Sequence, residues 1–317
     1  MSRNTPLAVL LLISTGLSTR AAAADDSGVT RQEDVIYGRK FGTALTLDVF
    51  RPEPKSRANG VGLIFVVSGG WVSSHEGINL GFVRPFTDRG YTVFAVVHGS
   101  QPKFTIPEVL QDMHRAVRFI RTHAAEYGVD PERLGIYGGS AGGHLSLMQG
   151  TAGTPGNPKA ADPVDRASSR VAAVACFFPP TDFLNYGKLG EDAFGRGTLA
   201  AFKAPFDVQE LDRKRNVFVP VVDEAVRKRI GVEISPVNHV TADDPPTLMI
   251  HGDADKLVPI QQAERIADKF REVKVPVKII VRPGLSHGWP KIADDLTIFA
   301  DWFDEHLKPA KPKPDKP

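Results

Sequence analysis

Cysteine is nearly absent from this chain: Cys176 is the single cysteine among 317 residues. An intrachain disulfide is therefore excluded, and so are zinc-ribbon and CxxC sites. An excess of charge is also lacking, since the formal net charge is +2. We thus expect no nucleic-acid partner. With 42% hydrophobic and 24% charged residues, the composition is that of a globular protein. Its length suits one domain of about 250–280 residues, or one domain with an insertion.

Long apolar runs are missing except at the N-terminus. Residues 6–17 are mostly apolar and follow Arg3, and Ala22-Ala23-Ala24 forms an A-x-A pattern before Asp25. This pattern predicts a signal peptide over residues 1–24, because the run is shorter than the ~20 residues that span a bilayer. We therefore expect a secreted or periplasmic protein with no membrane partner. The alternative is an uncleaved N-terminus that is disordered or anchors the chain to a membrane.

The rest of the chain alternates between strand and helix patterns. The clearest helix is predicted over residues 107–127, where apolar side chains recur on one helical face. This alternation predicts an α/β fold with a mostly parallel central sheet and helices on both faces. Strand patterns cover residues 34–37, 44–50, 61–67, 91–97, 134–137, 171–178, 247–250 and 277–281, and further helical patterns cover 79–89, 260–273, 291–307 and the residues after 141.

Two segments interrupt the alternation, and a third ends it. Residues 151–170 are rich in glycine and proline and predict a loop. Residues 182–235 form a longer insertion, which we expect over the C-terminal edge of the sheet. Its charges nearly cancel, and it is either a lid or a solvated excursion with a short helix. The Lys/Pro tail, 308–317, predicts a disordered or extended segment.

The motif Gly-x-Ser-x-Gly at residues 138–142 indicates a nucleophile. It follows the strand at 134–137 and precedes a helix, which is the setting of a nucleophile elbow. The turn requires small neighbours, and Gly138, Ala141 and Gly142 provide them. We therefore predict that Ser140 is a catalytic nucleophile.

Two later loops supply the acid and the base that a serine nucleophile requires. Both follow strands, so their side chains are expected at the same sheet edge as Ser140, in the order Ser, acid, His. Asp255 is favoured as the acid over Asp253, which we expect to bond backbone within its own loop. His287 is the predicted base. The other histidines lack this placement, and His144 is expected to support packing in the helix after Ser140.

An oxyanion requires backbone N–H donors. One is expected from Ala141, directly after the nucleophile, and the other from the loop after the strand at 61–67. Gly69, Gly70 and the N–H of Trp71 are the candidates there. Trp71 and Trp289 flank the predicted site. They either bind substrate, by stacking on a sugar or an aromatic ring, or belong to the core.

The motifs GGSAGGH, HGDADKLVP and PGLSHGW resemble those of the esterase/lipase branch of the α/β-hydrolases. That branch includes hormone-sensitive-lipase-like carboxylesterases and bacterial feruloyl and acetyl-xylan esterases, and the similarity runs from about residue 61 to 307. The resemblance implies an α/β-hydrolase fold and a serine carboxylic-ester hydrolase with no cofactor and no metal. It assigns the triad Ser140, Asp255 and His287. The implied substrate is a small-molecule or polysaccharide-linked ester, with an acetyl or feruloyl group.

The chain departs from these relatives at two places near the expected cleft. Val67-Ser68 stands where such enzymes often have His-Gly before Gly-Gly-Trp, and residues 97–100 replace an Asp-Tyr-Arg segment. Substrate class is therefore less constrained than mechanism. The alternatives are a prolyl-oligopeptidase-type serine peptidase, a lipase, or a catalytically inactive hydrolase-fold binding protein. Nothing in the sequence predicts the oligomeric state.

Overall fold

The computed structural model describes residues 24–25 and 28–308 of the chain. The predicted signal peptide, apart from Ala24, and the predicted Lys/Pro tail, apart from Lys308, lie outside these residues. No helix in the described part of the chain is both long and apolar enough to cross a membrane.

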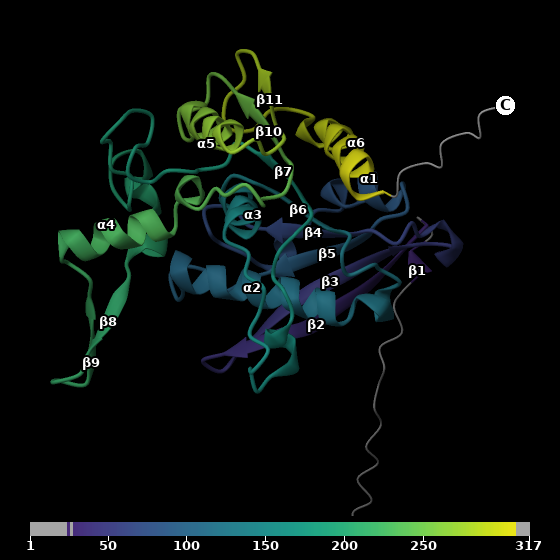
Figure 1. Cartoon of the computed structure of the whole chain (residues 1–317), viewed down its shortest axis with the longest axis horizontal. Helices are drawn as coiled ribbons and strands as arrows, with labels where there is room; N and C mark the ends of the chain where they lie inside the picture. The colour runs from purple at the N-terminus through teal and green to yellow at the C-terminus, as the bar shows by residue number, and fades with distance from the viewer. Residues whose placement is uncertain (1–23, 26–27, 309–317) are drawn as a thin grey trace, which may run out of the picture.

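A nine-stranded sheet forms the centre of the molecule (Figure 1). The first three pairs of neighbouring strands, β1–β2, β2–β3 and β3–β5, are antiparallel, and the remaining five pairs are parallel. The predicted mostly parallel sheet is therefore confirmed. In the order in which they lie side by side, the strands are β1 (Ala24–Asp25), β2 (Val29–Lys40), β3 (Thr43–Pro52), β5 (Thr92–Val97), β4 (Gly62–Val67), β6 (Leu134–Gly139), β7 (Ala173–Phe177), β10 (Thr247–Gly252) and β11 (Val277–Arg282).

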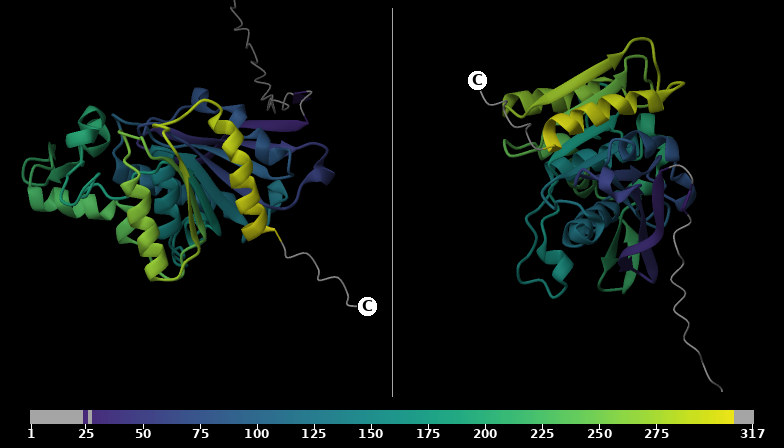
Figure 2. Two further views of the ribbon diagram at one scale, coloured as in Figure 1. Left: turned by 90° about the horizontal axis from the view of Figure 1, so that it is seen from above. Right: turned by 90° about the vertical axis from the view of Figure 1, so that its right-hand side faces the viewer.

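Helices cover both faces of the sheet, which explains the continuously apolar central strands (Figure 2). One face packs against α2 (Ile106–Thr122), α3 (Ala141–Thr151) and α5 (Gln261–Glu272). The other packs against α1 (Arg84–Thr87) and α6 (Leu296–Leu307). The α/β-hydrolase fold predicted from the sequence is therefore present.

Three helices are shorter than predicted. The helix expected over residues 291–307 begins only at Leu296, after a 3₁₀ turn at Ile292–Asp295. The helix expected over residues 107–127 ends at Thr122, and a separate 3₁₀ turn follows at Ala124–Tyr127. There the ring of His123 bonds the carbonyl of Phe119, which caps the end of α2. The helix expected over residues 79–89 is only the four residues of α1, preceded by a 3₁₀ turn at Leu80–Phe82.

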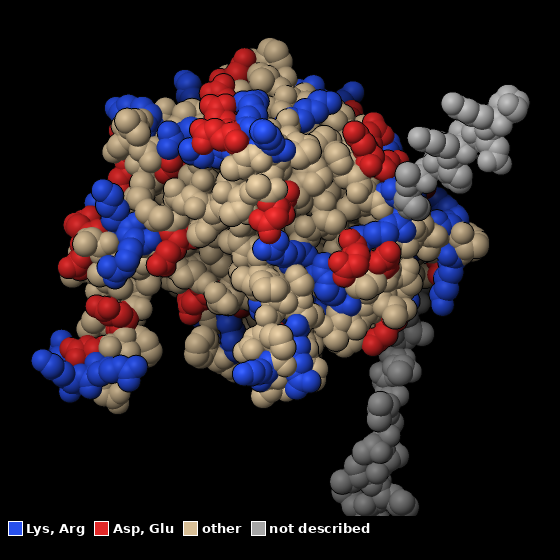
Figure 3. Space-filling model, viewed as in Figure 1, with Lys and Arg blue, Asp and Glu red and all other residues tan. Residues whose placement is uncertain are grey.

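The insertion at residues 182–235 lies to one side of the sheet and has its own short elements (Figure 1). Its helix is α4 (Glu224–Glu233), as the sequence suggested. The hairpin of β8 (Gln209–Asp212) and β9 (Val217–Pro220) was not predicted. Two 3₁₀ turns, Gly197–Phe202 and Ala204–Phe206, lie closer to the core. Figure 3 shows basic and acidic side chains interspersed over the visible face of the molecule.

Candidate active site

Ser140 lies at the sharp turn between β6 and α3, as the motif predicted. Its backbone has φ 54° and ψ −120°, a conformation that is strained for any residue other than glycine. The turn is fixed on both sides, because the N–H of Ser140 donates to the carbonyl of Phe177 at 3.0 Å and the N–H of His144 donates to the carbonyl of Ser140 at 2.9 Å. The hydroxyl is thus held above the end of the strand.

The two glycines of the motif are required because there is no room for a side chain at either position. A Cβ on Gly138 would lie 2.7 Å from the backbone carbon and oxygen of Gly142, and a Cβ on Gly142 would lie 2.8 Å from the carbonyl oxygen of Val66. Both contacts are with backbone, which cannot rotate away. The tight elbow therefore depends on glycine at each position.

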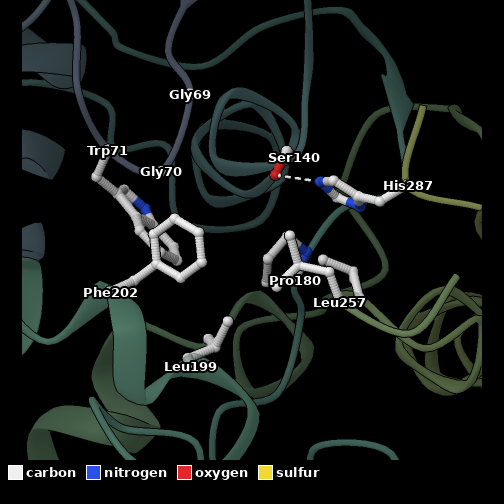
Figure 4. A pocket seen from close by; sticks show the side chains of 10 residues that line it. Gly69, Gly70, Trp71, Ser140, Pro180, Leu199, Phe202, Leu257 and His287 are labelled. Carbon is white, nitrogen blue, oxygen red and sulfur yellow. Dashed lines mark hydrogen bonds between the residues drawn. The ribbon is translucent and has the colours of Figure 1, made fainter.

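Ser140, His287 and Asp255 come together at one sheet edge, beyond the ends of β6, β11 and β10. The Nε2 of His287 is 2.9 Å from the Oγ of Ser140 (Figure 4). The Nδ1 of His287 is 2.7 Å from the Oδ2 of Asp255. Asp255 is buried, whereas His287 is partly open to solvent. A catalytic serine, its general base and an orienting carboxylate would require a hydrogen-bond chain of this geometry.

The carboxylate of Asp255 is fixed by its own loop. Its Oδ1 accepts the N–H groups of Leu257 and Val258, each at 2.9 Å, which leaves Oδ2 for the imidazole. Asp253 instead accepts the N–H of Gly284 at 2.6 Å. Gly284 lies in the loop after β11, so this bond joins two loops and is not the bond within its own loop that we expected. The structure thus brings Asp255, and not Asp253, to His287, as expected from the sequence.

The loop after β4 turns tightly at Gly69–Val72. The N–H of Gly69 donates to the carbonyl of Val72 at 3.0 Å, and the reverse bond measures 2.9 Å. Gly69 is therefore no longer a candidate oxyanion donor. Gly70 and Trp71 have φ 56° and 60°, and their N–H groups donate to no acceptor among the described residues. They remain as candidates, together with the N–H of Ala141, the first residue of α3.

A cavity of about 270 Å³ opens beside Ser140 (Figure 4). Leu199 and Phe202 of the insertion form one wall, so this part of the insertion covers the site. Trp71 is buried and lines the cavity. The full lining is Gly69, Gly70, Trp71, Ser140, Pro180, Leu199, Phe202, Leu257, Val258 and His287.

Trp289 does not line this cavity. Its indole N–H donates to Asp295 at 3.0 Å, and its ring packs edge-on against Phe177 and Phe178. Of the two tryptophans proposed to contact substrate, only Trp71 reaches the cavity, whereas Trp289 packs at the margin of the core.

A model of the BD-FAE family matches residues 47–270. The chain belongs to the BD-FAE family. Among curated relatives, the probable carboxylic ester hydrolase LipM of Mycobacterium tuberculosis (strain ATCC 25618 / H37Rv) is 30% identical over 81% of this chain and 56% of its own length. Esterase LipC of the same strain is 27% identical over 80% and 59%. This BD-FAE chain thus spans a little over half the length of these relatives.

Solved structures with the same fold include a truncated form of a carbohydrate esterase from gut microbiota. It is 25% identical to this BD-FAE chain, with a TM-score of 0.65 over 90% of this chain and 99% of that one. An acetyl ester-xyloside bifunctional hydrolase from Caldicellulosiruptor lactoaceticus is 22% identical, with a TM-score of 0.68 over 86% and 95%. The second likeness supports the fold alone.

The sequence did not indicate half of the residues that line the cavity of this BD-FAE protein, namely Pro180, Leu199, Phe202, Leu257 and Val258. Leu199 and Phe202 lie in an insertion with no motif, so no local signal pointed to them. The positions of Leu257 and Val258 beside the site could have been predicted, because both residues closely follow Asp255, whose carboxylate their N–H groups bind.

One group of metal-ligand types occurs among the described residues, namely Glu33, Asp48 and His75. The guanidinium of Arg31 contacts all three, at 3.4 Å, 2.6 Å and 3.3 Å respectively. A cation of the protein itself therefore already occupies the position among these side chains and offsets one of the two carboxylate charges, so the group does not fit a metal site.

Proposed function

We propose that this chain is a serine carboxylic-ester hydrolase in which Ser140, His287 and Asp255 form the catalytic triad. The observation that carries the proposal is the hydrogen-bond chain from Asp255 through His287 to Ser140, at 2.7 Å and 2.9 Å, on a strained elbow. The names of the relatives point the same way.

The proposed reaction proceeds through an acyl-enzyme. His287 Nε2 takes the proton of Ser140 Oγ as that oxygen attacks the ester carbonyl carbon. Asp255 holds the Nδ1–H tautomer and stabilises the imidazolium that forms. The N–H of Ala141, with that of Gly70 or Trp71, stabilises the oxyanion. The imidazolium then protonates the leaving alcohol, and water activated by His287 hydrolyses the acyl-enzyme.

The cavity suits the acyl group of an ester, which we propose to be short. Its volume of about 270 Å³ equals that of about nine water molecules at liquid density, and most of its lining is apolar. We further propose that the alcohol side is a sugar, as in acetylated or feruloylated polysaccharide, and that the protein is exported. The names of the solved relatives, a carbohydrate esterase and an acetyl ester-xyloside hydrolase, favour this substrate class.

The test is hydrolysis of p-nitrophenyl acetate, butyrate and octanoate by the protein lacking residues 1–24, beside its Ser140→Ala variant. We expect turnover that is highest on the short esters and falls by about 10⁴–10⁶ in the variant. A variant with undiminished activity would refute the nucleophile.

Two further measurements separate the alternatives. A fluorophosphonate probe should label Ser140, and labelling without turnover on any ester would favour a peptidase of the prolyl-oligopeptidase type. Absence of both, in folded protein, would favour a binding protein. Release of acetate or ferulate from xylan tests the sugar-ester substrate, and fractionation of cells expressing the full chain tests export.

A further inference from the structure

Two buried histidines that the proposed mechanism does not use contact the loop that supplies the candidate oxyanion donors. We propose that His144 and His98 are positioning residues, which hold the loop at residues 68–73 in its active shape by accepting hydrogen bonds from Trp71 and Ser68. This inference rests on the proposed esterase function, because the loop's N–H groups have their role only in that reaction.

The hydrogen bonds of His144 define its tautomer. Its Nε2 lies 2.7 Å from the carbonyl oxygen of Ile234. Since a carbonyl only accepts, Nε2 must carry the proton. The lone pair of Nδ1 is then free to accept the indole N–H of Trp71, which lies 3.2 Å away. Both ring nitrogens are thus satisfied, and they are satisfied only in the neutral ring.

His144 links three segments of the chain near the site. Its own helix, α3, begins directly after Ser140, and its backbone N–H donates to the Ser140 carbonyl. Ile234 is the C-cap residue of α4 in the insertion, and Trp71 lies in the loop at residues 68–73, here termed the oxyanion loop. Trp71 has φ 60°, which is uncommon for a bulky residue and persists only where the surroundings hold it. The His144 bond is one such restraint.

His98 restrains the first residue of the same loop. Its Nδ1 lies 2.7 Å from the Gly99 carbonyl oxygen, so this nitrogen carries the proton. Its Nε2 accepts from the Ser68 hydroxyl at 2.9 Å. The backbone N–H of His98 donates to the hydroxyl of Ser73 at the other end of the loop.

The two departures from the related esterases meet at this bond. Ser68 stands in the altered oxyanion segment and His98 in the segment that replaces Asp-Tyr-Arg. Each supplies half of one hydrogen bond, so the two replacements act together as a support for the loop.

Burial keeps both rings in the accepting form. It lowers the pKa of His98 and of His144 to about 4. At neutral pH both imidazoles are therefore uncharged, as the two hydrogen-bond patterns require.

The matched control is His114, which is also mostly buried, with its pKa lowered by burial to about 4. It bonds Ser169 and Gln149 rather than the oxyanion loop. A histidine that matters only for packing should behave as this residue does when it is replaced.

The experiment compares kcat and KM on p-nitrophenyl acetate for the wild type, His144→Phe, His144→Gln, Ser68→Ala and His114→Gln. Removing a whole oxyanion donor costs about 10²–10³ in kcat. A displaced loop should cost less, so we expect kcat to fall about 10- to 100-fold in His144→Phe and Ser68→Ala, with KM little changed. The glutamine at 144, which can accept and donate, should restore most of kcat. The control should keep wild-type kcat.

A second readout needs no activity. In protein labelled with ¹⁵N-tryptophan, the Trp71 indole N–H resonance, assigned with Trp71→Phe, should shift in His144→Phe and stay in place in His114→Gln. If His144→Phe does not fold, Ser68→Ala carries the kinetic test. An active wild type whose kcat survives both His144→Phe and Ser68→Ala, or Ser68→Ala alone where His144→Phe does not fold, overturns the inference. A wild type inactive on every ester refutes the proposed function instead, and an unshifted indole resonance would then overturn the bond itself.

Discussion

Replacing Phe202 by alanine should lengthen the acyl chain that the site accepts. Phe202 belongs to the insertion, lines the cavity beside Ser140, and packs over the oxyanion loop: a Cβ on Gly70 would lie 2.8 Å from its ring. Removing the ring enlarges the apolar cavity on the side away from the serine. The added space should accept roughly three methylenes, each contributing about 0.8 kcal/mol when buried.

The expected change follows from that sum. About 2.4 kcal/mol corresponds to roughly 60-fold in kcat/KM, so the ratio of octanoate to acetate hydrolysis should rise by about that factor. Acetate is too short to reach the vacated space and should change little. The assay is the p-nitrophenyl ester series from acetate to decanoate, measured as kcat/KM for the wild type and the variant.

Phe218→Ala is the matched control, since Phe218 lies in the same insertion but is 70% exposed on β9. Its chain-length profile should equal that of the wild type. An octanoate-to-acetate ratio that is the same in Phe202→Ala and in the wild type would refute the assignment of this wall to the acyl group.

Three further outcomes are expected. Asp255→Asn should lower kcat about 10⁴-fold, because the tautomer of His287 is no longer held; a loss below tenfold in steady-state kinetics would argue against the triad. Gly142→Ala should reduce the free energy of unfolding by about 1–3 kcal/mol, measured by urea denaturation, since its Cβ would lie 2.8 Å from a backbone oxygen. The free energy of unfolding should also fall as pH drops from about 6.5 towards 4, because in that range His98, His114 and His144 bind protons in the unfolded chain but not when they are buried in the folded protein. A urea midpoint that stays constant over this pH range would contradict the lowered pKa values of these histidines.

The sequence predicts those helices and strands whose formation depends mainly on the pattern of residues next to one another in the chain. Strands such as β4 and β5 are continuous apolar runs, and every residue of β4 is buried. The end of α2 was misplaced because a side chain, that of His123, bonds the last turn. The hairpin of β8 and β9 escaped prediction because its residues are mostly exposed and give no clear alternation of burial.

The candidate triad was predictable for a topological reason. In a parallel sheet, loops that follow the strands meet at one edge, so three loops far apart in sequence converge without any knowledge of side-chain packing. The availability of a donor within a loop is a finer matter. From the sequence, Gly69 is as plausible a donor as Gly70, but in the structure the N–H of Gly69 is already bonded to the carbonyl of Val72.

The cavity wall depends on contacts that no local pattern encodes. Phe202 reaches Gly70 from 132 positions away along the chain, and its placement follows from how the insertion packs against the oxyanion loop. His144 makes a similar link through hydrogen bonds, since it joins Trp71 to Ile234, the C-cap residue of α4. The residues proposed to select the acyl group and those proposed to position the oxyanion donors therefore belong to one packed unit. Substitutions in the insertion that shift Ile234 should for this reason lower kcat, whereas those that shift Phe202 should change the chain-length preference. Substitutions on the exposed hairpin should leave both unchanged.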